Sequence, residues 1–572
     1  MKSSIIKKAI VFSLGIFTVL LYANTDTHER NGVAVKSSNP GNCIRVPNQP
    51  PNEENQAKQI QNRILELYDK LLEPTVRVQV GSMWASAVVV SEDGYILTAG
   101  HVIDAVEGKE TNVTLSDDTV YKAICLGKDV DADYGLMKIE TTKKLAFAEM
   151  GNADGLAKDE TCLMFGHPET SEKGHPAIGR IGFYKGINKG DYLKTSCLMM
   201  PGDSGGPLFD LNGKLIGICS YIDSGLGENY YASIKNVKKN WNKLIEGKTF
   251  NNAQEYYDDS IMEAPIKNKP YVLKGGKKTL VKLLANHKNK IYRSIVTIES
   301  RVNEETVSTQ GTIFNDVGYI VAKSSQIGDA NVYCTLSNAQ KIDAKVIGRN
   351  EDNDLVVLKI ESPEKLQAIN LGDQKEIKPG QLLGTISNND NIIWAGMLGL
   401  GSRKISSKET GYLGIQFKES NNVIVESIVK NGPAEKAKLK AGDKIIAFNN
   451  TKIPTIEDLI EKLSKTRPNE TVKITILRKE KEKKLDVVMG RRNPNVNSEY
   501  SEHPADQVKV SKIRDGFTKA FTHDMPLKLN HCGTPVFNLK GEVYGINIAR
   551  KGRTCSLAIP SKQIEEIINT IL

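Results

Sequence analysis

A duplication at the scale of whole domains is the feature of this sequence that most constrains its fold. Residues 87–104 read AVVVSEDGYILTAGHVID and residues 311–329 read GTIFNDVGYIVAKSSQIGD, so both place Gly-Tyr-Ile directly after a turn. Further along, SGGPLFDLNGKLIGI at 204–218 resembles CGTPVFNLKGEVYGI at 532–546. The chain is therefore expected to contain two related copies of one fold.

The pattern within the copies is typical of β structure. From Val76 to about Ile216, short apolar runs alternate with glycine and aspartate turns, which favours a barrel or sandwich over a parallel sheet. An amphipathic helix is expected at 54–72, because apolar residues follow one another there at spacings of three and four, at Ile60, Ile64, Leu67 and Leu71. The predicted fold class is mainly β, with two double β-barrel domains.

A segment of another kind interrupts the second copy between about Lys404 and Arg492. It begins GYLGIQF at Gly411, continues GPAEKAKLKAGDKIIAFNN at 432–450, and ends with a helix-like stretch and two strands. This segment closely resembles the α+β PDZ domains. The resemblance implies that a peptide adds a strand to the sheet edge while successive backbone groups hold its C-terminal carboxylate, those of Tyr412, Leu413, Gly414 and Ile415. The alternative interpretation is a tight turn into a strand.

The first residues have the layout of a secretory signal peptide. Three lysines precede an apolar run from Ala9 to Tyr22, which ends at Ala23 and is followed by polar sequence. The expectation is a signal peptide over residues 1–23. The alternative is an uncleaved membrane anchor, but crossing a bilayer takes about 20 apolar residues and this run is shorter.

Export would place the chain in an oxidising compartment. Its eight cysteines are spread widely with no CxxC pair. Disulfides could form in that compartment, but the sequence does not indicate which cysteines would pair. Removing residues 1–23 takes away three lysines and no acids, which lowers the formal net charge from +9 to +6. No basic stripe with interleaved aromatic residues occurs, so nucleic acid is not an expected partner.

The chemistry of the first copy centres on two motifs. TAGH at 98–101 follows an apolar strand and sets His101 at a strand end. The glycines of PGDSGGP at 201–207 allow backbone N–H groups to point at one spot beside the serine oxygen, as an oxyanion hole requires, with Gly202, Asp203 and Ser204 as its residues. A serine hydroxyl is a weak nucleophile at neutral pH. His101 is therefore the candidate base that takes the proton of Ser204.

The imidazole in turn needs a carboxylate on its far nitrogen, which fixes the tautomer and stabilises the imidazolium. Three acids are near in sequence, Asp129, Asp131 and Asp133. Asp133 is the preferred candidate, because it opens the strand YGLMKI and aligns with Asp354 in the second copy. Asp131 is the alternative.

The order His, Asp, Ser, with the first two in one barrel and the serine in the next, resembles chymotrypsin-like serine proteases. More narrowly, ILTAGHV, an aspartate opening LMKI, and LFDLNGKLIGI are similar to bacterial HtrA-type proteases over most of residues 78–240. The resemblance implies an endopeptidase that works through an acyl-enzyme. Its implied substrates are unfolded, damaged or mislocalised proteins of the periplasm or cell envelope, with the PDZ domain reading exposed C-termini. The resemblance also allows for a homo-oligomer.

Two features depart from the HtrA pattern. Asp203 stands where an asparagine is more usual, and the PDZ domain does not follow the protease directly. An aspartate at this place is the form found in trypsins, where it pairs with an N-terminus freed on activation. No matching activation site precedes Val78, so activation of a zymogen is not expected.

The second copy lacks the same chemistry. Alignment sets Ser325 opposite His101 and Cys532 opposite Ser204, so the base is missing. A thiol with a pKa of about 8.5 is only slightly ionised at neutral pH. His531 and His523 are the candidate substitute bases, although His531 is the direct neighbour of Cys532 and adjacent strand residues point to opposite faces. A structural pseudoprotease is expected, and a cysteine peptidase is the alternative.

No cofactor and no metal are expected, because His167 and His175 lie in a loop pattern without a ligand cluster. The competing hypotheses for the whole chain are a chaperone or adaptor that binds unfolded chains with vestigial proteolysis, and an esterase. The expected domain boundaries are a signal peptide at 1–23, a flexible linker at 24–53, the protease domain with its leading helix at 54–246, a linker at 247–277, the degenerate domain at 278–404 and 493–572, and the PDZ domain at 405–492.

Overall fold

The computed structural model describes most of the chain from Glu53 to Leu572. The residues it leaves undescribed are 1–52, 82, 107–108, 169–173, 189, 224, 252–271, 303–304, 329, 371–376, 389–392, 407–410, 418–422, 431, 467–469 and 491–508. The expected signal peptide, the linker up to residue 52 and most of the linker at 247–277 therefore lie outside the described residues. No described helix is long and apolar enough to cross a membrane.

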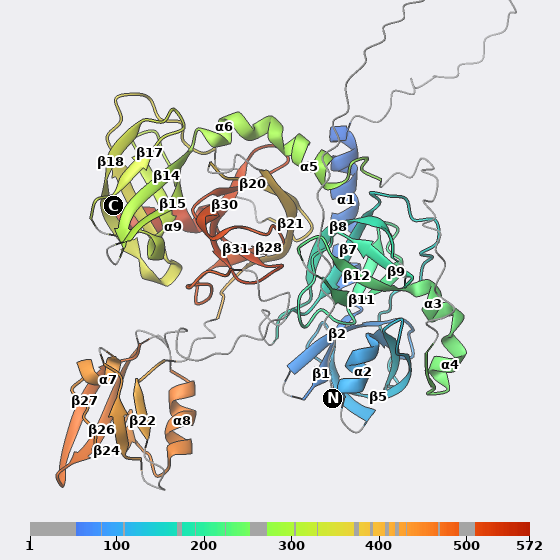
Figure 1. Ribbon diagram of the computed structural model, residues 1–572, viewed down its shortest axis with the longest axis horizontal. Helices are drawn as coiled ribbons and strands as arrows, with labels where there is room; N and C mark the ends of the chain where they lie inside the picture. The colour runs from blue at the N-terminus through green and yellow to red at the C-terminus, as the bar shows by residue number, and fades with distance from the viewer. Residues whose placement is uncertain are drawn as a thin grey trace, which may run out of the picture. The chain divides into compact units, whose positions relative to one another are not determined.

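The predicted amphipathic helix is confirmed as α1 (Glu53–Leu72). All four of the predicted apolar residues are buried, and Tyr68 joins them on the same face. Glutamates at its first turn and Lys70 at its last complement the helix dipole. The helix packs against the strands β7 and β8 described below (Figure 1).

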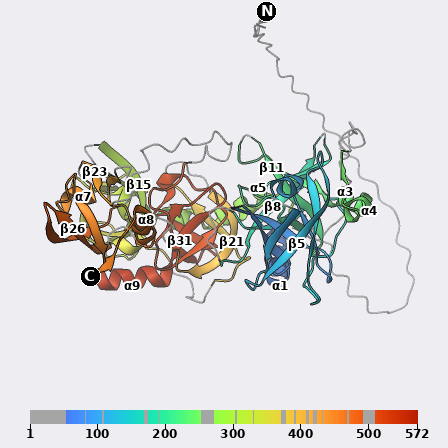
Figure 2. The ribbon, with the colours of Figure 1, turned by 90° about the horizontal axis from the view of Figure 1, so that it is seen from below.

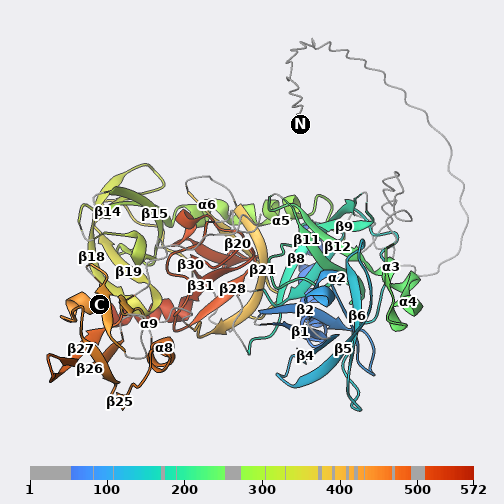
Figure 3. The same ribbon diagram turned by 60° about the horizontal axis from the view of Figure 1, so that its bottom comes forward.

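The first barrel is built from β1 (Thr75–Val80), β2 (Met83–Val89), β3 (Tyr95–Thr98), β4 (Glu110–Thr114), β5 (Val120–Asp129) and β6 (Tyr134–Ile139). Its strands run in the order β5-β4-β1-β2-β3-β6, and pairing of β5 with β6 closes the sheet. The short helix α2 (Gly100–Ala105) follows β3 directly (Figure 3). A short strand, β13 (Thr249–Phe250), pairs with β5, so this piece of the expected linker belongs to the barrel.

The second barrel of the first copy contains β7 (Thr161–Gly166), β8 (Ile178–Ile187), β9 (Tyr192–Thr195), β10 (Pro207–Asp210), β11 (Leu215–Ile222) and β12 (Asn229–Ser233). It closes in the order β10-β11-β12-β9-β8-β7. Two short helices follow it, α3 (Ile234–Lys239) and α4 (Trp241–Ile245). The cleft between the two barrels is thus reached from one side by the end of β3 and from the other by the segment before β10.

The second copy repeats this plan after α5 (Lys277–Leu284) and α6 (Lys288–Tyr292). Its first barrel closes through β14 (Ile295–Val302), β15 (Glu305–Ile313), β16 (Tyr319–Lys323), β17 (Tyr333–Thr335), β18 (Lys341–Asn350) and β19 (Leu355–Ile360). Asp133 and Asp354 even share the same left-handed backbone conformation, with φ of 51° at both. The structure therefore reproduces the duplication seen in the sequence.

The last barrel is assembled from two distant stretches of the chain. Before the insertion come β20 (Leu382–Ile386) and β21 (Ile393–Arg403), and after it come β28 (Ala520–His523), β29 (Pro535–Asn538), β30 (Val543–Arg550) and β31 (Ser556–Pro560). Pairing of β21 with β28 and of β20 with β29 closes the barrel. Figure 1 shows the olive and red strands side by side in it. The helix α9 (Ser561–Ile571) ends the chain and packs against β30.

The inserted segment has a core of its own. It contains β22 (Ile415–Phe417), β23 (Val425–Ile428), α7 (Pro433–Lys436), β24 (Lys444–Phe448), β25 (Thr451–Lys452), α8 (Ile456–Ser464), β26 (Thr471–Arg478) and β27 (Lys481–Val488). Thr455 caps α8 in a capping box with Asp458. Its buried apolar residues, from Leu413 to Met489, pack on one another. The fold class, mainly β with an α+β insertion, is confirmed.

One apolar cluster extends across both copies, beside clusters that belong to a single copy. A single cluster joins α1, the second barrel of the first copy, α5 and the last barrel. The strands β21 and β8 lie against each other at this contact (Figure 2), and a Cβ added at Gly399 would come within 2.6 Å of the Gly179 carbonyl oxygen. The seven described cysteines are free thiols and all are buried. Packing, and not cross-linking among these cysteines, holds the described part of the copies together.

Candidate active site

His101 and Asp133 lie side by side at the ends of two neighbouring strands of the first barrel, β3 and β6. His101 is the second residue of α2, and Asp133 lies in the turn before β6. The His101 Nδ1 atom is 2.9 Å from Asp133 Oδ1 and 3.0 Å from Oδ2, and the His101 backbone N–H donates to Oδ1 at 2.9 Å. The hydroxyl of Ser220, in β11, donates to Oδ2 at 2.5 Å. The carboxylate is thus oriented from three directions and holds His101 by Nδ1, so the other ring nitrogen, Nε2, is left to act as a base.

The hydrogen bond to Asp133 raises the pKa of His101 above its ordinary value of 6.5, while partial burial of the ring opposes this shift. A carboxylate that stabilises the imidazolium strengthens the ring as a proton acceptor. The ring is about half exposed at 51%, so it can meet a substrate. This is the electrostatic setting that a general base needs.

The neighbouring acid Asp129 has a different role. It is fully buried and accepts hydrogen bonds from the backbone N–H groups of Asp131 and Ala132, at 3.1 and 3.0 Å, and from the Tyr134 hydroxyl at 3.1 Å. These bonds fix the turn that carries Asp133. The geometry therefore favours Asp133 over the alternative, Asp131, as the partner of His101.

Ser204 and His101 line one cavity of about 320 Å³. Its other walls come from the segment Met199–Asp203 and from the end of β11, at Cys219, Ser220, Tyr221 and Ile222. Most of these side chains are apolar, and none of the lining residues other than His101 and Asp203 is ionisable at neutral pH. Because Asp203 turns its carboxylate away into the core, the cavity suits an uncharged side chain.

Beside Ser204, the backbone forms a tight turn. Gly202 has φ of 92°, a conformation that favours glycine. The Asp203 N–H donates to the Met200 carbonyl at 3.0 Å, so including Asp203 among the oxyanion donors was wrong. Among the described residues, the N–H groups of Gly202 and Ser204 donate no hydrogen bond. These two groups are therefore available to bind an oxyanion.

Ser86, in β2, anchors this turn from the first barrel. Its hydroxyl donates to the Gly202 carbonyl at 2.8 Å, and its N–H donates to the Ser204 carbonyl at 2.9 Å. Gly205 comes so close that an added Cβ would lie 2.2 Å from the Ser86 carbonyl oxygen. The two barrels are thus joined directly at the serine, and the sequence pattern gave no indication of this contact.

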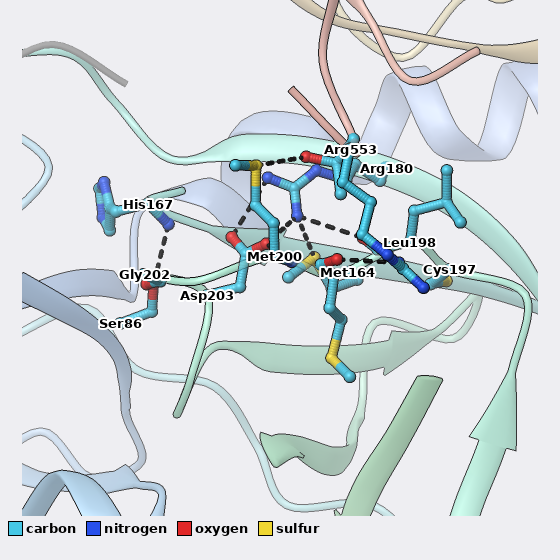
Figure 4. Close-up of polar contacts among 12 residues, drawn as sticks. Ser86, Met164, His167, Arg180, Cys197, Leu198, Met200, Gly202, Asp203 and Arg553 are labelled. Carbon is cyan, nitrogen blue, oxygen red and sulfur yellow. Dashed lines mark hydrogen bonds and ion pairs between the residues drawn. The ribbon is translucent and has the colours of Figure 1, made fainter. Parts of the chain in front are cut away.

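The Asp203 carboxylate forms a fully buried ion pair with Arg180 of β8 (Figure 4). The two bonds are 2.5 Å, from Nη1 to Oδ2, and 3.2 Å, from Nη2 to Oδ1, and both side chains are 1% exposed. Burial raises the pKa of Asp203, and the guanidinium partly offsets this shift. Arg180 supplies the cation that a freed N-terminus supplies in trypsins. A lone arginine inside the apolar run AIGRIGFY was the sequence signal for such a partner.

The insertion has the backbone geometry expected of a carboxylate-binding loop. Gly414 has φ of 79°, and the loop is held by hydrogen bonds from Tyr412 N to Gly490 O and from Val429 N to Gly414 O. Leu413 is buried in the core, whereas Ile415 opens the strand β22. Within the described residues, the N–H groups of Leu413 and Gly414 donate no hydrogen bond.

The matching site of the second copy is closed. Ser325 takes the place of His101, and its N–H and hydroxyl donate to the Asp354 carboxylate at 2.7 and 2.8 Å. The buried Lys323 ammonium pairs with the same carboxylate and donates to the Ile513 carbonyl at 3.0 Å. Ser511 pairs with the backbone of Arg550, so the segment around Ser511 and Ile513 lies over this site.

Cys532 is fully buried beneath that segment. Its Sγ atom is 3.9 Å from the Ser511 hydroxyl, and burial raises the pKa of the thiol. His523 bonds to Asn547 at 2.9 Å and its pKa is lowered to about 4 by burial, while His531 Nδ1 accepts from the Lys528 N–H at 3.3 Å. Neither histidine is directed at the thiol by these contacts. The arrangement favours a structural second copy.

His167 and His175 lie beside Arg77 and not in a ligand cluster. The Arg77 Nη2 atom is 3.4 Å from His167 Nδ1 and donates to the His175 carbonyl at 3.0 Å. Burial lowers the pKa of His167 to about 3. Among the described residues, no group of three or more His, Cys, Asp or Glu side chains is placed to hold a metal ion.

Comparison with known proteins gives two family matches. Residues 85–218 match the trypsin-like peptidase domain, a span that includes His101, Asp133 and Ser204, and residues 411–489 match the PDZ domain. A probable periplasmic serine endoprotease DegP-like of a Marinomonas species is 24% identical over 394 residues, covering 68% of this chain and 75% of the relative.

Other relatives match over a shorter stretch. The periplasmic serine endoprotease DegP of Escherichia coli is 34% identical over 164 residues, and a probable DegP-like endoprotease of Chlamydia trachomatis is 34% identical over 149. The chain spans only 34% and 28% of the lengths of these two relatives.

Among solved structures, a serine endoprotease from Yersinia pestis is 14% identical, covering 76% of this chain and 98% of that one, with a TM-score of 0.29. The two family matches give the two kinds of domain, and the relatives are named as serine endoproteases. The chain is therefore HtrA-like, combining a trypsin-like peptidase domain of the serine-endopeptidase class with a PDZ domain.

Proposed function

We propose that this chain is a serine endopeptidase that cleaves unfolded or damaged proteins of the cell envelope. The observation that carries the proposal is the single cavity that Ser204 and His101 share, with Asp133 on the far nitrogen of the imidazole. The HtrA-like relatives, which are named periplasmic serine endoproteases, support the same conclusion.

In the proposed reaction, His101 Nε2 takes the hydroxyl proton of Ser204 while Ser204 Oγ attacks the scissile carbonyl. The Gly202 and Ser204 N–H groups bind the oxyanion of the tetrahedral intermediate. The imidazolium then gives its proton to the leaving amine, and an acyl-enzyme remains. A water molecule, deprotonated by His101, hydrolyses this ester and returns the free serine.

The cavity walls suggest which peptide bonds are cut. Met199, Met200 and Ile222 surround the space next to Ser204, so an apolar side chain on the acyl side of the bond would be desolvated there at low cost. A charged side chain would lose its hydration without gaining a counter-charge, because Asp203 is already paired. We therefore expect cleavage after medium-sized apolar residues.

Product mapping on an unfolded protein tests this proposal directly. Wild type, Ser204→Ala and the matched control Cys532→Ser are incubated with reduced, unfolded casein, and the products are sequenced by mass spectrometry. Wild type and Cys532→Ser should cut after apolar residues at equal rates, and Ser204→Ala should not cut. Equal inactivity of wild type and Ser204→Ala, with casein bound, would instead support a chaperone or adaptor.

The division into domains and the export of the chain are part of the proposal. The signal peptide at 1–23 would direct the chain to the periplasm, the location in the names of its relatives. The proposed protease domain is 54–246, and the PDZ domain at 405–492 splits the degenerate domain into 278–404 and 493–572. Mass spectrometry of the periplasmic protein should find an N-terminus at Asn24, and a retained Met1 would contradict cleavage.

The PDZ domain is proposed to bind peptide C-termini through the loop of Tyr412, Leu413, Gly414 and Ile415. The Tyr412 N–H already donates to the Gly490 carbonyl, so the N–H groups that follow it would hold the carboxylate. A free carboxylate would accept hydrogen bonds from the loop N–H groups, and the peptide would extend the sheet beside β22. Calorimetry on the full chain carrying Ser204→Ala should detect binding of peptides with a free C-terminus. The same peptides with an amidated C-terminus should bind at least about tenfold more weakly, since they lose a charge-assisted contact.

A further inference from the structure

A loop of the second copy reaches the candidate active site of the first. The loop joins β30 to β31, and its Arg553 side chain is 4% exposed. Arg553 Nη1 donates to the Met199 carbonyl and to Asn229 Oδ1, both at 3.0 Å, and Nη2 donates to the Gly225 carbonyl at 2.6 Å. Figure 4 shows the side chain approaching the buried Arg180–Asp203 pair.

These three acceptors come from two segments that border the cavity beside Ser204, the one that leads into the serine turn and the one that continues from β11, whose residues Cys219–Ile222 line the cavity. Met199 lines the cavity and directly precedes the turn that carries the serine. Gly225 lies in the connection from β11 to β12, and Asn229 is the first residue of β12, so both lie just behind the wall formed by the end of β11. Asn229 already accepts from the Met199 N–H at 3.1 Å, so the guanidinium completes a link between the walls. The adjacent Thr554 hydroxyl contacts Met200 Sδ at 3.1 Å.

The hydrogen bonds that join the two segments need a guanidinium, and a side chain of similar size without these donors could not make them. The acceptors diverge from one another, and a planar guanidinium presents donors in several fixed directions, whereas an ammonium is a compact point charge. Burial lowers the pKa of Arg553, and the nearby Asp203 carboxylate opposes this shift. A buried guanidinium held by carbonyl oxygens is costly unless these bonds are made, so displacing either wall is penalised.

Hydrogen bonds also fix the backbone of the loop that carries Arg553. Arg550 donates to the carbonyl groups of Leu527 and Gly552, and the Lys551 and Gly552 N–H groups donate to the Cys555 carbonyl. The last barrel is in turn held to β8, because the Ile181 N–H donates to the Asp524 carboxylate at 3.0 Å. Arg553 therefore projects from a rigid loop on a docked barrel.

We propose that Arg553 is a positioning residue that braces both walls of the substrate cavity, so that the degenerate copy serves the first copy as a permanent in-chain activator. This proposal rests on the proposed peptidase function. The turn from Gly202 to Ser204 is held separately by Arg180 and Asp203. The brace consequently governs substrate binding more than the reactivity of Ser204.

The test compares Arg553→Ala and Arg553→Lys with Arg349→Ala in the full chain. Arg349 is the matched control, because its guanidinium bonds to the Ser324 hydroxyl and to the carbonyl groups of Ser324 and Ile327 within the second copy. With a peptide substrate, Arg553→Ala should raise KM by about ten- to a hundredfold, the loss expected for charged hydrogen bonds, and Arg553→Lys by less. Arg349→Ala should keep the KM of wild type.

Two further readouts separate positioning from a general loss of structure. Labelling of Ser204 by a small fluorophosphonate, which does not fill the cavity, should proceed in Arg553→Ala at nearly the rate of wild type. Added ethylguanidinium should restore KM in Arg553→Ala and leave Arg349→Ala unchanged. Arg553→Ala with an unchanged KM, or an equal rise of KM in Arg349→Ala, would overturn the brace. If Arg553→Ala does not fold, Arg553→Lys decides by the same criteria.

Hydrogen exchange tests the role of Arg553 without relying on peptidase activity. Arg553→Ala should speed exchange of the amides at 196–204 and 225–229 in a Ser204→Ala background, where no activity is needed. A wild-type chain without Ser204-dependent hydrolysis would contradict the peptidase function but leave this measurement intact. Unchanged exchange at both walls would overturn the brace even if the chain cleaves peptides.

Discussion

At the residue scale, Asp203 and Arg180 form a buried ion pair, so removing either charge should destabilise the folded chain. Asp203→Asn gives the chain the residue more usual in HtrA-type serine loops, but it leaves a buried guanidinium without a counter-charge. Removing one partner of such a pair costs about 3–5 kcal/mol. We expect this loss in the free energy of unfolding for Asp203→Asn, measured by urea denaturation, together with reduced turnover.

The double variant Asp203→Asn, Arg180→Met is the control for this prediction. It removes both charges, and replacing a buried pair by apolar groups is often neutral. The double variant should therefore recover much of the stability lost by Asp203→Asn. Additive losses across the cycle would show that the two side chains are not coupled.

The pH dependence follows from His101. Its pKa is raised above 6.5, chiefly by the hydrogen bond to Asp133, and the base must be neutral to accept the serine proton. The acid limb of kcat/KM should thus have its midpoint above pH 6.5. The same shift favours the protonated folded state, so this contribution to stability is fully present below pH 6.5 and is lost as pH rises through the folded pKa.

Asp133→Asn tests the cause of that shift. The variant removes the hydrogen bond that raises the pKa, so the acid limb should move to lower pH, and kcat should fall by about 10⁴ because the imidazole loses its orienting carboxylate. Asp131→Asn is the matched control from the same turn and should leave both the limb and kcat unchanged. A loss in Asp131→Asn that equals the loss in Asp133→Asn would contradict the assignment.

How much of the site could be predicted depends on whether the contacts are local in sequence. His101 and Ser204 lie in motifs whose turn chemistry is visible in a few residues, and Asp133 could be singled out through its counterpart Asp354. Ser86, Ser220 and Arg180 were missed because their partners lie 23 to 116 residues away. Arg553, 324 residues from Asn229, depends on how the two copies dock, which no local pattern encodes.

At the element scale, Tyr68 of α1 makes polar contacts to both copies. The buried Tyr68 hydroxyl donates to the Gly399 carbonyl of β21 and accepts from the Gly179 N–H of β8 at 3.0 Å. The sequence predicted this helix and its apolar face from spacing alone. It could not predict the polar contact at the end of a tyrosine that also fits an apolar face.

Tyr68→Phe should therefore lower the free energy of unfolding by about 1–3 kcal/mol, since it leaves two backbone groups buried without their partner. Tyr333→Phe is the control, because within the described residues the Tyr333 hydroxyl makes no hydrogen bond. It should change stability little. Chemical denaturation of both variants measures the difference, and equal stabilities would show that the hydroxyl of Tyr68 contributes nothing.

At the scale of the whole molecule, the apolar cluster that extends across both copies is expected to couple their stabilities. Ile64 of α1 is fully buried, and a Cβ added at Gly380 in the second copy would lie 3.0 Å from its Cγ2 atom. Removing its side chain should thus weaken both copies. The PDZ core consists of its own residues, so it should unfold separately.

Ile64→Ala and Val472→Ala test this division of stability. Each truncates a fully buried side chain, and cavities of this kind cost about 1–5 kcal/mol. Native-state hydrogen exchange should show faster opening in both copies for Ile64→Ala, with the amides of 411–489 unchanged, and the reverse for Val472→Ala. Faster opening of the first copy alone would mean that the second copy is stable by itself. A degenerate copy that folds only with its partner has a reason to persist without chemistry of its own.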